Sequence, residues 1–163
     1  DEFAYQSQLK YQKAKEAGKF KDELLAYSIP QKKGDPILFA EDEHPRLSPL
    51  EKLAELKPAF IKDGSVTAGN SSGINDGAAL LILADEETVV KNNLSPMARV
   101  VSFGVAGVDP SIMGIGPVPA TQKALKRAGL SINDIDLAEI NEAFASQAIA
   151  SMRDLGINPE IVN

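Results

Sequence analysis

The sequence contains no cysteine and only one histidine, and these two absences limit its chemistry most sharply. Without cysteine, this chain cannot form a disulfide, a thiolate nucleophile or a cysteine-ligated metal site. The histidine, His44, stands in the polar turn "EDEHPRLSP", where a surface loop position is the expected interpretation and a catalytic or pH-sensing role is the alternative. No G-x-S-x-G motif accompanies His44, so the sequence does not support a serine–histidine hydrolase.

Long apolar runs and a surplus of positive charge are also missing. No run reaches the ~18 residues that a membrane-spanning helix needs. The 17 basic and 23 acidic residues give a formal charge of −6, which argues against a nucleic-acid platform. We therefore expect a globular, cytoplasmic protein with neither nucleic acid nor membrane as a partner. An anionic small molecule held by a few local cations is still an allowed ligand.

The first half of the sequence combines one long helix with loops. Residues 1–17 are rich in Lys, Glu, Gln and Ala, which favour a helix, and Gly18 marks its end. Residues 27–49 carry five prolines and glycines and predict mostly loop, with one short strand or hairpin around "PILFA". The stretch "SPLEKLAEL" predicts a short helix with Ser48 as its cap and Pro49 in its first position.

The second half alternates strand and helix patterns. The apolar runs 77–84, 98–108 and 135–141 predict three buried strands. The stretch "DEETVVKNN" and residues 119–129 and 142–156 predict three helices, the last two closed by Gly129 and Gly156. The order βαβαβα predicts an α/β fold with helices covering a largely buried sheet.

Three glycine-rich or polar stretches are candidate ligand sites. "GSVTAGNS" has the spacing of a phosphate-binding P-loop, but Asn70 stands where that loop needs lysine. It is therefore either an ordinary turn that enters a strand or a loop shaped for another ligand. Residues 141–144 and 114–117 follow predicted strands, where ligands of α/β sheets usually bind. The stretch "GIGPVP" in the second of these is not a dinucleotide fingerprint, because prolines replace its open backbone.

Three blocks of the sequence closely resemble the corresponding blocks of the thiolase family, which comprises the acetyl-CoA acetyltransferases and the 3-ketoacyl-CoA thiolases. The blocks are "VTAGNSSGINDGAALLILADE", "GVDPSIMGIGPVPATQKAL" and "LAEINEAFASQAIA", and the resemblance covers essentially the whole chain. It implies a thiolase-like fold, part of a layered αβαβα arrangement. Residues 1–75 would be the end of the loop domain with part of the coenzyme A (CoA) surface. Residues 76–163 would be the first βαβαβα portion of the C-terminal domain.

The resemblance also implies roles for eight residues. Ser72 would hydrogen-bond the pantetheine arm of CoA, with Ala68 and Gly69 packing beside it. Asn141 would position a water that stabilises the thioester oxyanion, and its alternative role is that of a helix N-cap. Ala143 and Phe144 would line the substrate channel, Met113 the acyl pocket, and Arg46 the adenine and phosphate end of CoA. Core packing is the alternative for Phe144 and Met113, and a solvated loop position is the alternative for Arg46.

The thiolases use a cysteine nucleophile, a G-H-P histidine and a second cysteine, and none of these occurs here. We therefore expect a central fragment of a CoA-dependent acyltransferase that is inactive alone. CoA or acyl-CoA would be its substrate, with no metal and no covalently bound cofactor. Its partners would be the missing segments of the same protein, in a parent homodimer or homotetramer. The alternative is a non-catalytic CoA-binding or interaction module derived from the thiolase fold.

Overall fold

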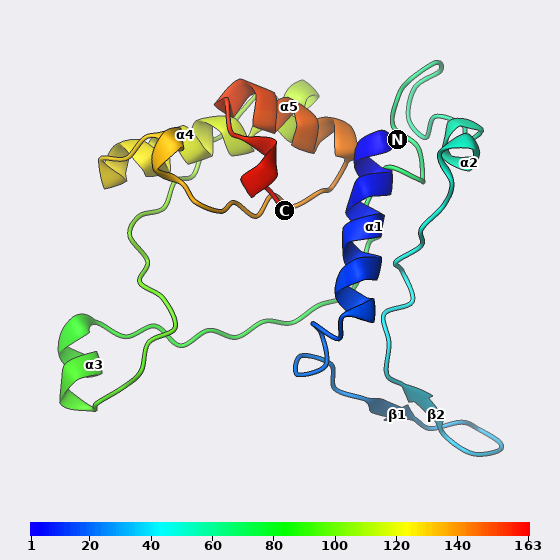
Figure 1. Cartoon of the computed structure of the whole chain (residues 1–163), viewed down its shortest axis with the longest axis horizontal. Coiled ribbons are helices and arrows are strands. Elements are labelled where there is room, and N and C mark those ends of the chain that lie inside the picture. The colour runs from blue at the N-terminus through cyan, green and yellow to red at the C-terminus, as the bar shows by residue number, and fades with distance from the viewer. The chain divides into compact units, whose positions relative to one another are not determined.

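The computed structural model describes all 163 residues, and Figure 1 labels the main helices and strands. The chain divides into two compact units. Unit 1 comprises residues 1–73 and 142–146, and unit 2 comprises residues 74–141 and 147–163. Each unit therefore contains segments from both halves of the sequence. The loop around Asn70 and the segment that follows Asn141 belong to unit 1.

Unit 1 begins with α1, Glu2–Glu16, which confirms the helix predicted over 1–17. Glu2 lies in its first turn and Lys13 and Lys15 in its last, as the helix dipole favours. Gly18 adopts a left-handed φ of 69° just beyond the helix, as expected of a glycine at a helix end. Gly18 therefore marks the C-terminal end of α1.

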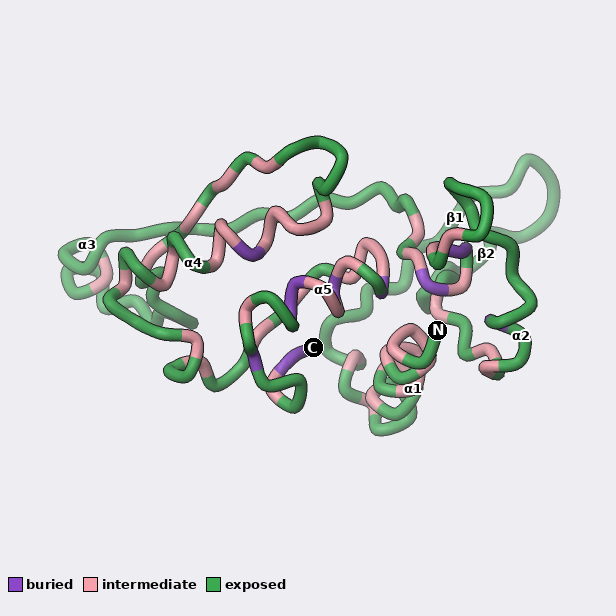
Figure 2. Tube along the Cα trace, turned by 90° about the horizontal axis from the view of Figure 1, so that it is seen from above, coloured by how far each residue is buried: buried purple, intermediate pink, exposed green.

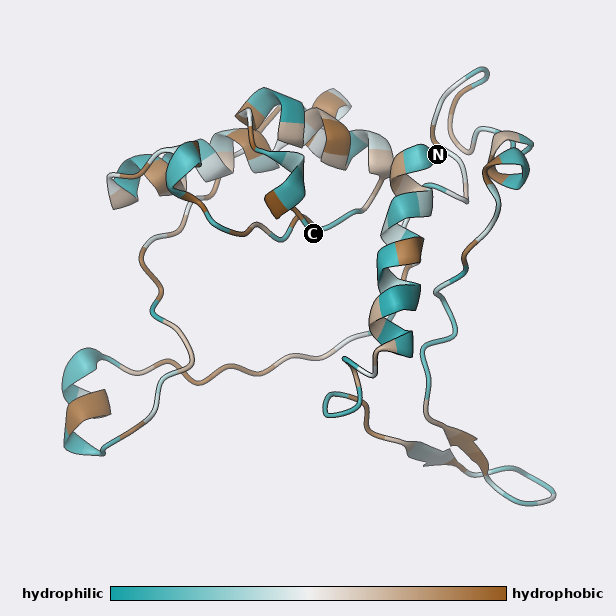
Figure 3. Ribbon diagram, viewed as in Figure 1, coloured by the Kyte–Doolittle hydropathy of each residue, from teal (hydrophilic) through white to brown (hydrophobic).

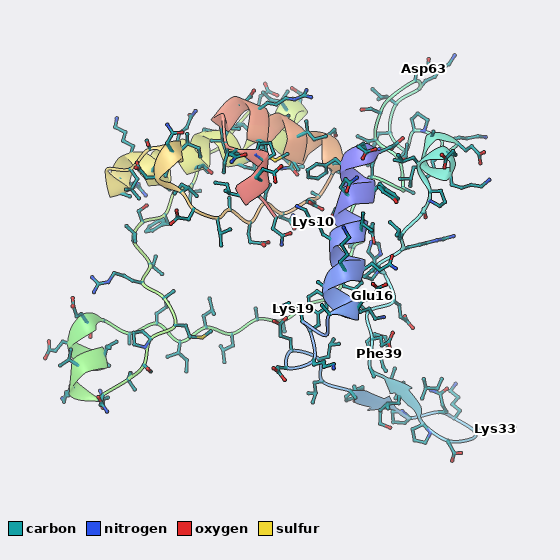
Figure 4. All side chains as sticks on the ribbon, in the orientation of Figure 1. Lys10, Glu16, Lys19, Lys33, Phe39 and Asp63 are labelled. Carbon is teal, nitrogen blue, oxygen red and sulfur yellow. The ribbon has the colours of Figure 1, made fainter.

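A two-stranded antiparallel hairpin follows, made of β1, Tyr27–Ile29, and β2, Ile37–Phe39. Tyr27 pairs with Phe39, and the hairpin predicted around "PILFA" is confirmed. Figure 4 places Lys33 at the tip of the hairpin and Phe39 on β2. Every residue of both strands is exposed, although β2 is strongly hydrophobic (Figure 3).

The short helix α2, Leu50–Ala54, forms where expected, but its predicted cap is wrong. Pro49, not Ser48, is the N-cap, and no side chain caps the helix. Pro49 has a ψ of 148°, so it is still extended, and its carbonyl accepts the first helical N–H groups from Lys52 and Leu53. Leu53 is the buried residue of this helix, with 6% of its surface exposed.

Unit 2 contains the remaining helices, and all three predicted ones form. They are α3, Glu86–Lys91, α4, Pro117–Ala128, and α5, Ala145–Leu155, whose first two residues belong to unit 1. Three 3₁₀ turns accompany them: η1, Pro110–Ile115, η2, Ile132–Asp134, and η3, Pro159–Ile161. Gly129 and Gly156 have left-handed φ values of 70° and 64°, which confirms them as helix ends.

The strands predicted at 77–84 and 98–108 do not form. Both segments lack regular secondary structure, and neither has a neighbouring strand whose backbone pairs with its own, as a strand requires. The apolar side chains of the first segment are almost fully exposed: Leu80 at 91%, Leu81 at 85% and Ile82 at 92%. The sequence of this segment has the pattern of a buried strand, but its apolar side chains are not buried in this chain.

The segment 98–108 instead lies along α4. The Ser102 hydroxyl donates to the Ala124 carbonyl at 2.7 Å, and Lys123 Nζ donates to the Val105 carbonyl at 2.6 Å. Arg127 donates to the Phe103 carbonyl at 2.8 Å and lies over the Phe103 ring, 5.3 Å from its centroid. Two side chains of α4 therefore donate hydrogen bonds to backbone carbonyls of this segment.

The third predicted strand, 135–141, is reduced to one parallel bridge between Ala138 and Val162. The Ala138 N–H donates to Ile161 at 2.9 Å, and the Asn163 N–H donates back to Ala138 at 2.9 Å. The C-terminal residues thus pair with the segment that leads to Asn141.

The buried residues of the chain are few and lie in short stretches, mainly on α5, in the residues after it and in the loop around Asn70 (Figure 2). The apolar ones are Leu53, Val118, Ala145, Ala148, Met152, Ile157 and Val162. None of the helices combines the length and hydropathy that a membrane span requires. No three His, Asp or Glu side chains gather in a cluster that could hold a metal ion.

Candidate functional site

The loop 64–73 in unit 1 is held by its own buried polar residues. Thr67 is 6% exposed and Asn70 is 9% exposed, whereas Ala68 and Ser72 are exposed. The Thr67 hydroxyl accepts the Gly69 N–H at 3.2 Å, and the Thr67 carbonyl accepts the Ser71 hydroxyl at 2.7 Å. The loop therefore turns two polar side chains inward and presents Ala68 and Ser72 to solvent.

The side chain of Asn70 makes three hydrogen bonds in this loop. Its Oδ1 accepts the Thr67 N–H at 2.8 Å, and its Nδ2 donates to the Ser65 carbonyl at 2.9 Å and to Asp1 Oδ1 at 2.9 Å. Asn70 thus occupies the lysine position of the P-loop pattern but faces the protein. Sequence reasoning noted that this residue departs from the P-loop but did not assign it a role.

Backbone hydrogen bonds join the loop 64–73 to the segment that follows Asn141. The Ser72 N–H donates to the Ala143 carbonyl at 2.9 Å, and the Ala145 N–H donates to the Asn70 carbonyl at 2.9 Å. Between these bonds, Ser71 and Phe144 form an antiparallel bridge. The structure therefore brings together two of the predicted sites, the glycine-rich loop and residues 143–144.

Two further contacts hold this segment within unit 1. Phe144 lies edge-on against Phe60, with ring centroids 5.8 Å apart and an interplanar angle of 88°. The Ser7 hydroxyl of α1 donates to Glu142 Oε2 at 2.6 Å, a short bond to a carboxylate. Residues on both sides of Ala143 are therefore fixed by side chains from other parts of the unit.

Gly69 permits close packing of the loop against α2. A methyl group at this position would come within 2.6 Å of both Leu53 Cδ2 and Leu56 Cδ1. The glycine therefore serves helix–loop packing, a need that is independent of any ligand.

Arg46 is exposed, and its backbone N–H donates to Gln8 Oε1 of α1 at 2.8 Å. A shallow pocket lies beside it, lined by Gln8, Tyr11, Gln12, Lys15, Pro45 and Leu47. Lys15 forms an ion pair of 2.7 Å with Glu41, and this hydrogen bond raises the pKa of Lys15 and lowers the pKa of Glu41. Arg46 is therefore an exposed cation whose backbone is tied to the middle of α1.

Asn141 and Met113 belong to unit 2, and both are exposed, Met113 at 70%. Helix α5 begins at Ala145, so Asn141 lies four residues before it and cannot be its N-cap. The alternative role offered for Asn141 is therefore wrong. Next to Met113, Gly114 packs on Gln147 of α5, where an added methyl group would come within 3.0 Å of Cγ.

Comparison with known proteins places the chain in a family. Residues 1–87 match the thiolase N-terminal domain, and residues 94–163 match the thiolase C-terminal domain. An acetyl-CoA acetyltransferase of Syntrophomonas wolfei is 56% identical over 96% of this chain and 39% of its own length. One from Paracoccus denitrificans is 49% identical over 100% of this chain and 42% of its own length. The chain belongs to the thiolase family, which confirms the resemblance inferred from its sequence.

Solved structures confirm the fold. The Bacillus anthracis acetyl-CoA acetyltransferase is 50% identical and superposes with a TM-score of 0.91, covering 100% of this chain and 41% of its own. Human mitochondrial 3-ketoacyl-CoA thiolase in complex with CoA is 48% identical with a TM-score of 0.88, covering 99% of this chain and 40% of its own. The chain thus spans about two fifths of the length of these relatives.

Proposed function

We propose that this chain is the CoA-loop segment of a thiolase that cleaves 3-ketoacyl-CoA or condenses two acyl-CoA molecules. The observation that carries the proposal is the loop 64–73. Buried Thr67 and Asn70 hold it, and exposed Ala68 and Ser72 face outward. A loop with small exposed residues and a hydroxyl suits the amide-bearing pantetheine arm of CoA. The names of the relatives, acetyl-CoA acetyltransferases, support the same substrate class.

Each predicted site residue has a defined task in this proposal. Ser72 offers its hydroxyl to a pantetheine amide, Ala68 and Gly69 pack beside the arm, and Ala143 and Phe144 wall the channel. Met113 contacts the acyl group, and Arg46 offers positive charge to the phosphates of CoA. Asn141 holds a water at the position where negative charge develops on the thioester oxygen.

Acyl transfer also needs a nucleophile and a base at the same point. This chain has no cysteine and cannot supply the thiolate. We therefore assign the covalent step to a cysteine elsewhere in the full-length protein, which would take the acyl group as a thioester. A homodimer or homotetramer in the cytoplasm is part of the same proposal.

Calorimetric titration with CoA tests the proposal in the full-length protein. We expect wild-type protein to bind CoA and Ser72→Ala to weaken binding about three- to tenfold, the loss of one hydrogen bond. Ser28→Ala, in the exposed hairpin, is the matched control and should bind as wild type. A wild-type protein that does not bind CoA would refute the proposal. CoA binding without thiolysis of acetoacetyl-CoA would favour the non-catalytic binding module.

A further inference from the structure

We propose that Asn70 is a positioning residue for the CoA loop and that Asp1 is its partner. The inference rests on the proposed function and assigns to these two residues a role in CoA affinity. It starts from the fact that the Asn70 carboxamide uses one acceptor and both donors, on Thr67, Ser65 and Asp1. The side chain is nearly buried, so water offers no easy replacement for a lost bond.

Asp1 provides an independent observation. Its carbonyl accepts the Tyr5 N–H of α1 at 2.8 Å, so its backbone is tied to this helix. Its carboxylate accepts a hydrogen bond from Asn70 Nδ2 at 2.9 Å. The Asp1 side chain thus links α1 to the loop, 69 positions away in the sequence.

The three partners explain why a carboxamide occupies the lysine position of the P-loop pattern. Lysine has only donors and could not accept the Thr67 N–H. A carboxylate has only acceptors and would face the Ser65 carbonyl and the Asp1 carboxylate. The asparagine side chain has an acceptor for the Thr67 N–H and two donors for the Ser65 carbonyl and the Asp1 carboxylate.

A shift of Asn70 would reach the predicted ligand contacts through the backbone. The Asn70 carbonyl accepts the Ala145 N–H, and Ser72, two residues on, donates to Ala143. Ala68 and Ser72 flank Asn70 at equal sequence distance, and both are exposed. Asn70 therefore sets where these two residues stand against a bound pantetheine arm, although its own side chain points away from solvent.

Asn70→Asp in the full-length protein tests the role with nearly unchanged size. We expect the KM for CoA in thiolysis to rise about tenfold, because a buried hydrogen bond is replaced by repulsion, while kcat stays within about twofold. Adding Asp1→Asn should recover part of the KM, because the new amide can donate to the carboxylate introduced at position 70. Asn92→Asp makes the same change at an exposed position of unit 2 and should leave the KM unchanged.

The results separate this role from the proposed function. A wild-type protein that neither binds CoA nor catalyses thiolysis would refute the proposed function. The role of Asn70 would be overturned if the KM of Asn70→Asp for CoA equals that of the wild type. It would also be overturned if adding Asp1→Asn does not lower the raised KM. If Asn70→Asp does not fold, Asp1→Ala decides: a KM about threefold higher supports the role, and an unchanged KM overturns it.

Discussion

Gly104 lies so close to α4 that a methyl group on it would overlap the carbonyl oxygen of Ala120. The obstacle is helix backbone, which cannot rotate away as a side-chain end can. Ser102, two residues earlier, donates to the next turn of the same helix at 2.7 Å. The absence of a side chain at Gly104 therefore permits the contact between the segment 98–108 and α4.

We predict that Gly104→Ala lowers the free energy of unfolding by about 1–3 kcal/mol, the usual range for overpacking. Gly107→Ala is the matched control in the same segment, because a methyl group there has no neighbour within 4 Å. It should be neutral or slightly stabilising. Urea unfolding of both variants measures the difference, and equal stability would show that the segment does not pack on α4 as described.

The helices of this fold could be predicted from the sequence because their signals are local. Gly18, Gly129 and Gly156 end α1, α4 and α5 with left-handed backbones, and Asp85 caps α3 through the Thr88 N–H. The strands at 77–84 and 98–108 were predicted but do not form. A strand depends on a neighbouring strand, and the pattern of one segment does not show whether that neighbour is present.

The site was predictable only in part for a related reason. The resemblance drew attention to the exposed residues Ala68 and Ser72, which would meet a ligand. The residue that shapes the loop, Asn70, is recognised only when its three partners are known, and one of them is 69 positions away. Long-range hydrogen bonds of this kind leave no periodic signal in a sequence.

Asn141→Ala in the full-length protein should lower kcat by about two to three orders of magnitude, the range for one oxyanion donor. Stability should change by less than about 0.5 kcal/mol, because Asn141 is exposed and does not cap α5. Steady-state thiolysis and thermal unfolding separate the two effects. A normal kcat would show that Asn141 is not part of the oxyanion site.

The purified 163-residue chain should show no thiolase activity. Acyl transfer of the proposed kind needs a thiolate, and the sequence contains no cysteine. Cleavage of acetoacetyl-CoA, followed by loss of its enolate absorbance, provides the assay, with a buffer blank as the control. Activity above the blank would contradict the assignment of the covalent step to a cysteine elsewhere.

Three aspartates should titrate below their ordinary pKa of 3.8: Asp85, Asp109 and Asp134. The Thr88 backbone N–H lowers the pKa of Asp85, and the hydroxyls of Ser111 and Ser131 lower those of Asp109 and Asp134. Since the folded pKa lies below the unfolded one, their contribution to stability is present above pH 3.8 and is lost as the pH falls through the folded pKa.

Carboxyl NMR titration measures these values directly. Ser131→Ala removes the main cause for Asp134 and should move the pKa of that residue back toward 3.8 while leaving Asp85 and Asp109 unchanged. An unshifted pKa of Asp134 in the wild-type chain would contradict the two hydrogen bonds of 2.7 Å that the N–H and hydroxyl of Ser131 donate to Asp134 Oδ2.

The last prediction concerns association of the 163-residue chain. Leu80, Leu81 and Ile82 are 85–92% exposed in consecutive positions, and their segment has no hydrogen-bonded neighbour. Exposed apolar surface together with an unpaired extended backbone favours contacts between copies. We therefore expect the chain to self-associate in the micromolar range, as measured by light scattering. Ile82→Lys should weaken this association, because a charge is costly to bury. Met97→Lys, at a fully exposed position outside the apolar run, should not weaken it. A clean monomer of 17.4 kDa with a cooperative melt would refute the prediction and favour a self-contained binding module.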